Sequence, residues 1–339
     1  MSNESGRGVG QGVEDPLPSF ESSPVETSRS RVELLRMGRE RNSAKAPTIS
    51  RRTSHTTGTR PSLEGKHPGS IGLSCCSGYV PCMDIALRDR FTGLWNEYFD
   101  GADLPITFFR GEGSKAAEKV PPPKSWRCMI CDLGRIRKGM TRSFDEESLS
   151  CSGATYYLGY TTERRPEFRY FLSAGKPGVV EGERYKRTPE IVDAMEQYRG
   201  HIPAEGRCYT FKRWDQLAEE DTPEVVIFFA RPEVLSGLFT LANFDQAEPD
   251  GGVICPFGSG CSSIVYYPLL EQQKENPKAV LGMFDPSARP CVMPDVLTMA
   301  IPMKKFEKMI GYMEESFLIT GSWEKVRKKI RSSAELHAR

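Results

Sequence analysis

Residues 225–244 read VVIFFARPEVLSGLFTLANF, and this stretch carries the clearest structural signal in the chain. Val225–Ala230 has the length and the branched and aromatic side chains of a buried strand. Pro232 suits the first turn of a helix, and apolar residues recur after it at helical spacing. A strand followed at once by a helix predicts a fold in which both kinds of element pack together.

The same alternation extends outward in both directions from this stretch. Further predicted strands are Ile106–Phe109, Arg169–Leu172, Ala279–Phe284 and Leu297–Ile301. Predicted core helices are Pro81–Phe99 and Lys304–Glu315. Strands and helices therefore mix along the chain, and we predict an α+β fold with mixed sheets and packed helices.

Composition divides the chain into three parts. Residues 1–78 are rich in Ser, Arg, Thr, Gly and Pro, and we predict a disordered tail because such a segment cannot bury enough apolar surface to offset its ordering entropy. Residues 79–331 carry all four tryptophans and every tyrosine. They are predicted to form one large domain, either undivided or as two lobes that meet at a cysteine site. Residues 332–339 are predicted to be a second tail.

Charge and hydropathy exclude several classes of partner. The formal net charge of +1 gives no reason to expect binding to nucleic acid. No apolar run reaches the length of a membrane span, and the first residues lack the apolar region of a secretory signal, so we expect a cytoplasmic protein. Ten cysteines in the cytoplasm should be mostly reduced, which favours metal binding or catalysis over disulfides.

The cysteines are spaced in a way that suggests one shared site. Cys128 and Cys131 form a C-x-x-C pair, and Cys151 and Cys261 each precede a predicted helix, where free N–H groups favour a thiolate. We expect the two halves of the chain to meet and to gather these thiols. The four are the predicted metal ligands, with Cys255 as a substitute or a neighbouring thiol.

The thiol set leaves three hypotheses for function. Four thiolates can hold an iron–sulfur cluster or zinc, and ligands so far apart in one large domain favour the cluster. The leading hypothesis is electron transfer or redox chemistry on a small anionic molecule, with a ligand or redox partner. The alternatives are a metal-free thiol enzyme that uses Cys151 or Cys261, and a ligand-binding or regulatory module with structural zinc. Only His201 lies in the predicted domain, which disfavours sites that need imidazole.

Two features are candidates for anion binding. Gly258, Ser259 and Gly260 form a glycine-rich loop before a predicted helix, where backbone N–H groups can hold an anion. Arg289 follows a predicted strand and could pair with a carboxylate or phosphate. A plain turn and an arginine in a loop salt bridge are the simpler interpretations.

Several segments together resemble a known family. The segments are PITFF, CSGATYYLG, LANFD, PFGSGC, PKAVLGMFD and IPMKKFEKM, with the cysteine region at Cys128 between the first two. From Asp84 to Ile330 the chain resembles the domain of unknown function 169 family. The resemblance implies a soluble domain with cysteines at positions like Cys151 and Cys261, and it implies no reaction. Near Cys291 the family carries a glycine- and cysteine-rich turn where this chain has SARPC, which puts a ligand role of Cys291 in doubt.

Overall fold

The computed structural model describes residues 83–112, 117–204 and 207–337, with side chains to residue 333. All of these residues belong to the second of two units, Ser74–Arg339. The predicted tail at residues 1–78 lies outside the described residues. Within the described part of the chain, no helix is both long enough and apolar enough to cross a membrane.

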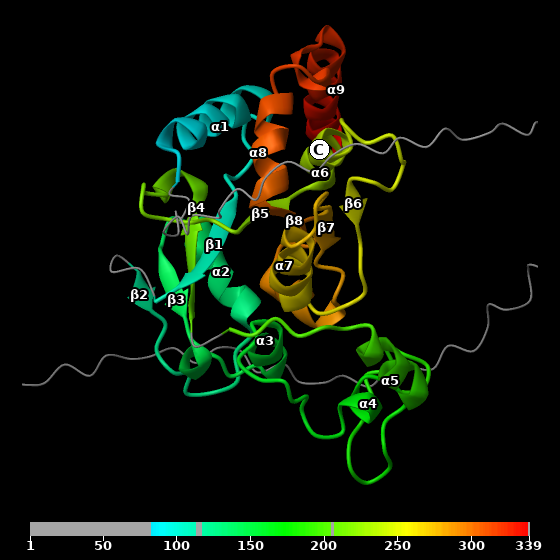
Figure 1. Ribbon diagram of the computed structural model, residues 1–339. Helices are drawn as coiled ribbons and strands as arrows, with labels where there is room; N and C mark the ends of the chain where they lie inside the picture. Colours follow the sequence, from blue (N-terminus) through cyan, green and yellow to red (C-terminus); the bar gives the residue numbers. More distant parts are fainter. Residues whose placement is uncertain (1–82, 113–116, 205–206, 338–339) are drawn as a thin grey trace, which may run out of the picture. The chain divides into compact units, whose positions relative to one another are not determined.

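An eight-stranded sheet runs through the fold in the order β2-β3-β4-β1-β5-β8-β7-β6 (Figure 1). The strands are β1 (Ile106–Gly111), β2 (Glu118–Lys119), β3 (Arg142–Phe144), β4 (Cys208–Arg213), β5 (Val225–Ala230), β6 (Val253–Ile254), β7 (Ala279–Gly282) and β8 (Leu297–Pro302). Neighbouring strands are antiparallel except for the edge pairs β2–β3 and β6–β7, which are parallel. One sheet joins the two halves of the chain, and the predicted α+β class is confirmed.

Helices pack on both faces of this sheet. The helices are α1 (Ile85–Tyr98), α2 (Met129–Arg137), α3 (Ser152–Tyr157), α4 (Phe168–Phe171), α5 (Pro189–Gln197), α6 (Pro232–Ala242), α7 (Tyr267–Gln272), α8 (Met303–Tyr312) and α9 (Gly321–His337). Of these, α4 and α5 lie together away from the sheet (Figure 1). Strand β5 shows why two cores form: successive side chains of a strand point to opposite faces. Val225, Ile227 and Phe229 therefore belong to one buried cluster, while Val226 and Phe228 belong to the other.

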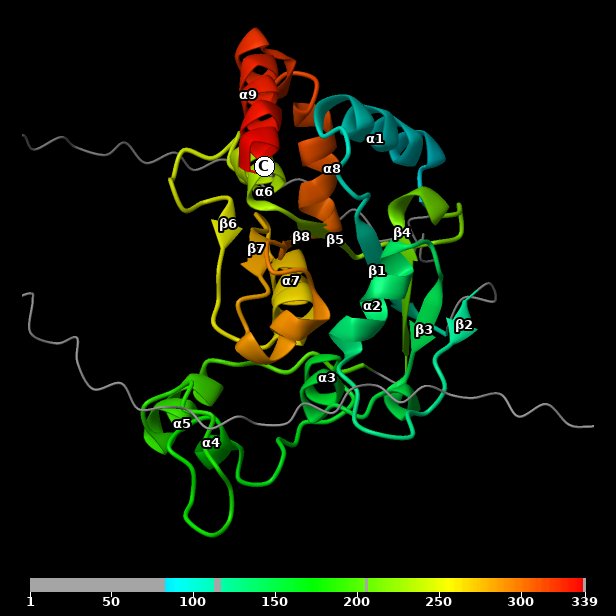
Figure 2. The same ribbon diagram turned by 180° about the vertical axis from the view of Figure 1, so that it is seen from behind.

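One core is aromatic and lies under α1, α6, α8 and α9, which gather on the same side in Figures 1 and 2. Phe91 of α1 packs edge-on against Trp214 and Phe306, with ring centroids 5.2 and 4.9 Å apart. The other core lies under α2, α3 and α7 and includes residues that flank the cysteines. This second core positions the candidate site.

A buried ion pair fixes the end of β4. The Lys212 ammonium lies 2.9 and 2.7 Å from the two carboxylate oxygens of Asp221, and the two side chains are 5% and 1% exposed. Asp221 also accepts the N–H of Ala218 at 2.8 Å. These bonds satisfy the buried carboxylate from two sides.

Two parts of the chain differ from the sequence prediction. Arg169–Leu172 was expected to be a strand, but Phe168–Phe171 form α4. Helical spacing lets Phe168 and Phe171 take the guanidiniums of Arg164 and Arg165 on their rings, at 4.6 and 3.9 Å. At the other end, α9 continues to His337, so the predicted tail that starts at residue 332 begins as helix.

Candidate functional site

A cavity of about 570 Å³ opens beside the starts of α2 and α3. Four cysteines line it: Cys128, Cys151, Cys255 and Cys261. The rest of its wall comes from the glycine-rich loop before α7, from residues 282–288, and from the segment at 164–199 that carries α4 and α5. The lining of this cavity therefore includes residues from both halves of the chain.

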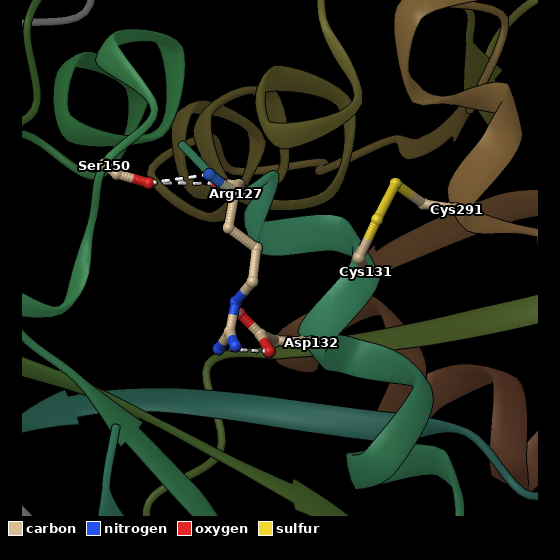
Figure 3. Close-up of a disulfide and its surroundings, with 5 residues drawn as sticks. All are labelled: Arg127, Cys131, Asp132, Ser150 and Cys291. Carbon is tan, nitrogen blue, oxygen red and sulfur yellow. Dashed lines mark hydrogen bonds and ion pairs between the residues drawn. A yellow bond between two sulfur atoms is a disulfide. The ribbon is translucent and has the colours of Figure 1, made fainter. Parts of the chain in front are cut away.

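The residues just before two of these cysteines hold them together. The backbone N–H of Arg127 donates to the Ser150 hydroxyl at 2.8 Å (Figure 3). Because these residues directly precede Cys128 and Cys151, the bond holds the two cysteines near each other. The Arg127 side chain then reaches back to Asp132 in the first turn of α2, with its Nε 2.9 Å from the carboxylate. This clamp joins the start of α2 to the segment that leads into α3.

Cys261 lies near Cys128 and Cys151 because the residue before it, Gly260, has no side chain. The helix that contains α7 begins at Gly260, whose N–H donates to the Asp285 carboxylate at 3.2 Å. A Cβ at Gly260 would stand 3.2 Å from a side-chain carbon of Ile130 and 3.1 Å from that of Ala288. The missing side chain therefore lets this helix start approach the start of α2. A π-helical turn follows immediately, and such turns are frequent at functional sites.

Burial controls the chemistry of these thiols. It raises the pKa of Cys261 well above the ordinary value, and the neighbouring Cys151 and Cys128 raise it further. Burial is also the main cause of the raised pKa of Cys128, and it raises the pKa of Cys255. As free thiols these three would be protonated at neutral pH and weak as nucleophiles.

Cys131, one of the four predicted ligands, does not line the pocket. It forms a disulfide with Cys291, with Cα atoms 4.7 Å apart (Figure 3). Cys128 is the N-cap of α2, and Cys131 lies three residues further on, in the first turn of the helix. The disulfide removes Cys131 from the set of free thiols. Among the described residues, no group of three or more His, Cys, Asp or Glu side chains is arranged to hold a metal ion.

The predicted anion-binding residues are only partly at the pocket. Gly258, Ser259 and Gly260 line it, but the N–H of Gly260 already serves Asp285. Arg289 is not part of the lining: its guanidinium donates to four backbone carbonyls, those of Met283, Met293, Pro294 and Val296. These bonds brace the loop before β8, and a role of Arg289 in anion binding stays a prediction.

Sequence reasoning missed the three arginines that line the pocket, Arg164, Arg165 and Arg199, of which Arg165 is exposed and the other two share one carboxylate. Arg164 Nε donates to one oxygen of Glu196 at 2.6 Å, and Arg199 Nη1 donates to the other at 2.8 Å. Their side chains are only 16% and 5% exposed. In the sequence they lie in turn-like segments, ERRPEF and QYRG, where arginine is normally solvated, so no local signal marked them.

Aromatic rings form much of the remaining wall. Phe168 and Phe171 line the pocket from α4. Trp126, Phe257 and Phe284 also line it and are largely exposed, at 69%, 49% and 55%. Large exposed rings around a cavity are typical of a site that contacts an apolar ligand.

Comparison with known proteins gives a family and no activity. Residues 104–311 match the model of the domain of unknown function 169 family, described as "Uncharacterised ArCR". Because the match spans more than half of the chain, the chain belongs to this family. No curated protein and no solved structure matches it.

Proposed function

We propose that this member of the domain of unknown function 169 family is a redox protein whose four pocket cysteines hold an iron–sulfur cluster. One observation carries the proposal. The described residues include five free cysteines, and four of them, Cys128, Cys151, Cys255 and Cys261, line one pocket. They come from three separate segments of the chain, so sequence proximity alone does not explain the grouping.

The four residues suit a cluster better than a single ion. Four cysteine thiolates are the usual ligands of [2Fe–2S] and [4Fe–4S] clusters. In a [4Fe–4S] cluster each cysteine binds a different iron, so the sulfurs lie further apart than around one zinc, where each Zn–S bond is about 2.3 Å. Such a cluster would supply one-electron transfer. Cys255, predicted as a substitute ligand, would replace Cys131 as the fourth ligand.

The protein's surroundings follow from the same reasoning. A cytoplasmic location would keep the pocket thiols reduced, whereas the Cys131–Cys291 disulfide would be unusual there, so the location stays a proposal. The site would act on a small anionic molecule or exchange electrons with a redox partner. The formal net charge of +1 gives no support for a nucleic-acid partner.

The test is metal analysis of protein purified without oxygen. We expect iron and sulfide at about four each per chain, with the broad visible absorption of a cluster. Serine at Cys128, Cys151 or Cys261 should lower the iron content. Serine at Cys208, a free cysteine on β4 outside the pocket, is the matched control and should leave it unchanged. Protein that stays colourless and iron-free after anaerobic reconstitution would exclude the cluster, and stoichiometric zinc would favour a structural zinc site.

A metal-free thiol enzyme is the second candidate, and the position of Cys151 favours it. Cys151 is half-buried at the N-cap of α3 and lines the pocket, so it is reachable by a ligand. In this case iodoacetamide at neutral pH should modify Cys151 selectively, as measured by peptide mass spectrometry. Cys261 is buried and should react slowly. Uniformly slow alkylation of metal-free protein would argue against this candidate.

A further inference from the structure

We propose that Arg164 and Arg199 form a subsite that binds the carboxylate of an organic monoanion with an apolar body. The subsite lies in the same pocket as the four cysteines. It deepens the proposed function, and its role as a substrate site rests on that function. The binding itself depends only on the pocket.

The first reason is an excess of buried positive charge. Arg164 and Arg199 both pair with Glu196, so two guanidiniums share one carboxylate. The arginine side chains are 16% and 5% exposed, and that of Glu196 is 24% exposed. One positive charge is therefore left without a partner in a site largely shielded from water. Burying an unpaired charge is costly, and an anion in the pocket would remove that cost.

The second reason is that each arginine keeps a buried donor without a partner. Nη2 of Arg164 and Nε of Arg199 have no hydrogen-bond acceptor among the described residues. The rest of Arg164 is fixed, because its guanidinium stacks on the Tyr156 ring at 3.3 Å. Arg199 is fixed by Glu196 and by the hydroxyl of Tyr157. Rigid guanidiniums with free N–H groups are suited to a carboxylate, which accepts such bonds strongly.

The acidic residues of the pocket do not cancel this charge. Asp285 is held by the backbone N–H groups of Gly260 and Ser287, at 3.2 and 3.0 Å. Glu183 is exposed and therefore solvated. Among the described residues, neither carboxylate bonds to Arg164 or Arg199. Arg165 also lines the cavity, but it is exposed to solvent and its guanidinium stacks on the Phe171 ring. The pair Arg164 and Arg199 is therefore the buried basic part of a mainly apolar cavity.

The rest of the wall specifies the body of the ligand. Phe168, Phe171 and Leu172 line the pocket on the segment that carries the arginines. A volume of about 570 Å³ lies in the range of small-molecule sites. A simple inorganic anion would leave these side chains without contact. The expected ligand class is therefore a carboxylic acid with an aliphatic or aromatic body.

The experiment is calorimetric titration of the full chain, prepared without oxygen. The probes are hexanoate, decanoate and 3-phenylpropionate, each compared with its neutral amide, and inorganic phosphate serves as an anion without a body. We expect at least one carboxylate to bind at least tenfold more tightly than its amide and than phosphate. Arg199→Gln should raise the dissociation constant of that carboxylate at least tenfold. Arg169→Gln is the matched control, because Arg169 pairs with Glu190 and Asp193 and does not line the pocket.

A second variant protects the test against loss of folding. Glu196→Gln removes the protein carboxylate that the two arginines share. It should therefore strengthen binding of the carboxylate ligand and leave binding of its neutral amide unchanged. If the Arg199 variant binds the carboxylate ligand more weakly and the Glu196 variant binds it more tightly, misfolding cannot explain both results. Equal affinity for acid and amide, or weaker acid binding in Glu196→Gln, would overturn the subsite. Iron content is measured on the same samples, so failure of the cluster and failure of the subsite are separate results.

Discussion

The disulfide between Cys131 and Cys291 is expected to contribute strongly to stability. It joins α2 to the 3-10 turn Pro286–Cys291, across a sequence separation of 160 residues. Both segments flank the pocket: Cys128 and Ile130 line it near one end of the bond, and Ala288 near the other. Breaking the bond therefore tests both the fold and the site.

The magnitude follows from the entropy of the unfolded chain. Closing a loop of about 160 residues lowers the chain entropy by about 17 cal/mol/K, or about 5 kcal/mol at 25 °C. This figure is an upper bound, because residual structure in the unfolded state reduces it. Disulfides typically contribute about 2–4 kcal/mol, and we expect a loss in that range when the bond is reduced.

The assay is urea denaturation with and without a phosphine reductant, followed by tryptophan fluorescence. Reduction should lower the midpoint of the wild-type protein. The double variant Cys131→Ser, Cys291→Ser should show the lower midpoint already and should not respond to the reductant. Cys208→Ser is the control that keeps the bond, and it should respond as the wild type does.

Two results would refute the reasoning. Peptide mapping of unreduced protein that finds both cysteines as free thiols would remove the bond itself. If mapping finds the bond and the midpoint still does not move on reduction, then the loop is already constrained in the unfolded state, and the entropy estimate fails.

Three further predictions concern individual residues, and each is tested by the free energy of unfolding from urea denaturation. Asp221→Asn should lower the free energy of unfolding by about 3 kcal/mol, because Lys212 would keep a buried charge without a partner. Asp215→Asn removes a more exposed ion pair and should lower it by less than about 1 kcal/mol. Gly159→Ala should lower the free energy of unfolding by about 2 kcal/mol or more, because the φ of Gly159 is +83° and a Cβ would lie 2.0 Å from a carbonyl oxygen. Its control is Gly93→Ala in α1, where a Cβ would meet open space, and this change should raise the free energy of unfolding by about 0.5–1 kcal/mol. Burial lowers the pKa of Lys305, so its charged form destabilises the native state below that pKa. Lys305→Met should therefore stabilise the protein at pH 7, with a gain that shrinks as pH rises towards the unfolded pKa of about 10.4. A gain that grows with pH would contradict this sign.

Elements with a strong local pattern could be predicted from the sequence, and very short ones could not. Val225–Ala230 has six apolar residues in a row, and the strand occupies the same residues. β6 is only Val253–Ile254, between two glycines and Cys255-Pro256, a segment without the apolar run of a strand. It is a strand because it pairs with β7, in register with Ala279 and Val280. Pairing across the chain leaves no periodic signal in two residues.

The candidate site also has parts that local sequence predicts and parts that it does not. The placement of Cys151 at the start of a helix followed from local sequence, and the structure confirms it. The arginine pair depends on Glu196 bonding to both Arg164 and Arg199, which are separated in sequence by α4, a loop and α5. No pattern of single residues contains that information, because the partner is chosen by the tertiary fold. Local rules thus located the thiols, while the charged part of the pocket required the structure.

The two cysteines of the C-x-x-C pair have different partners. Cys128 lines the pocket with the other free thiols, while Cys131 is exposed and bonded to Cys291. Both belong to the start of α2, with Cys128 at the N-cap and Cys131 in the first turn. While Cys131 is bonded to Cys291 it cannot act as a metal ligand, whereas a reduced Cys131 would be a free thiol three residues from Cys128. It follows that reduction should weaken the link between α2 and the 3-10 turn Pro286–Cys291, and that it would also give the C-x-x-C pair its second free thiol.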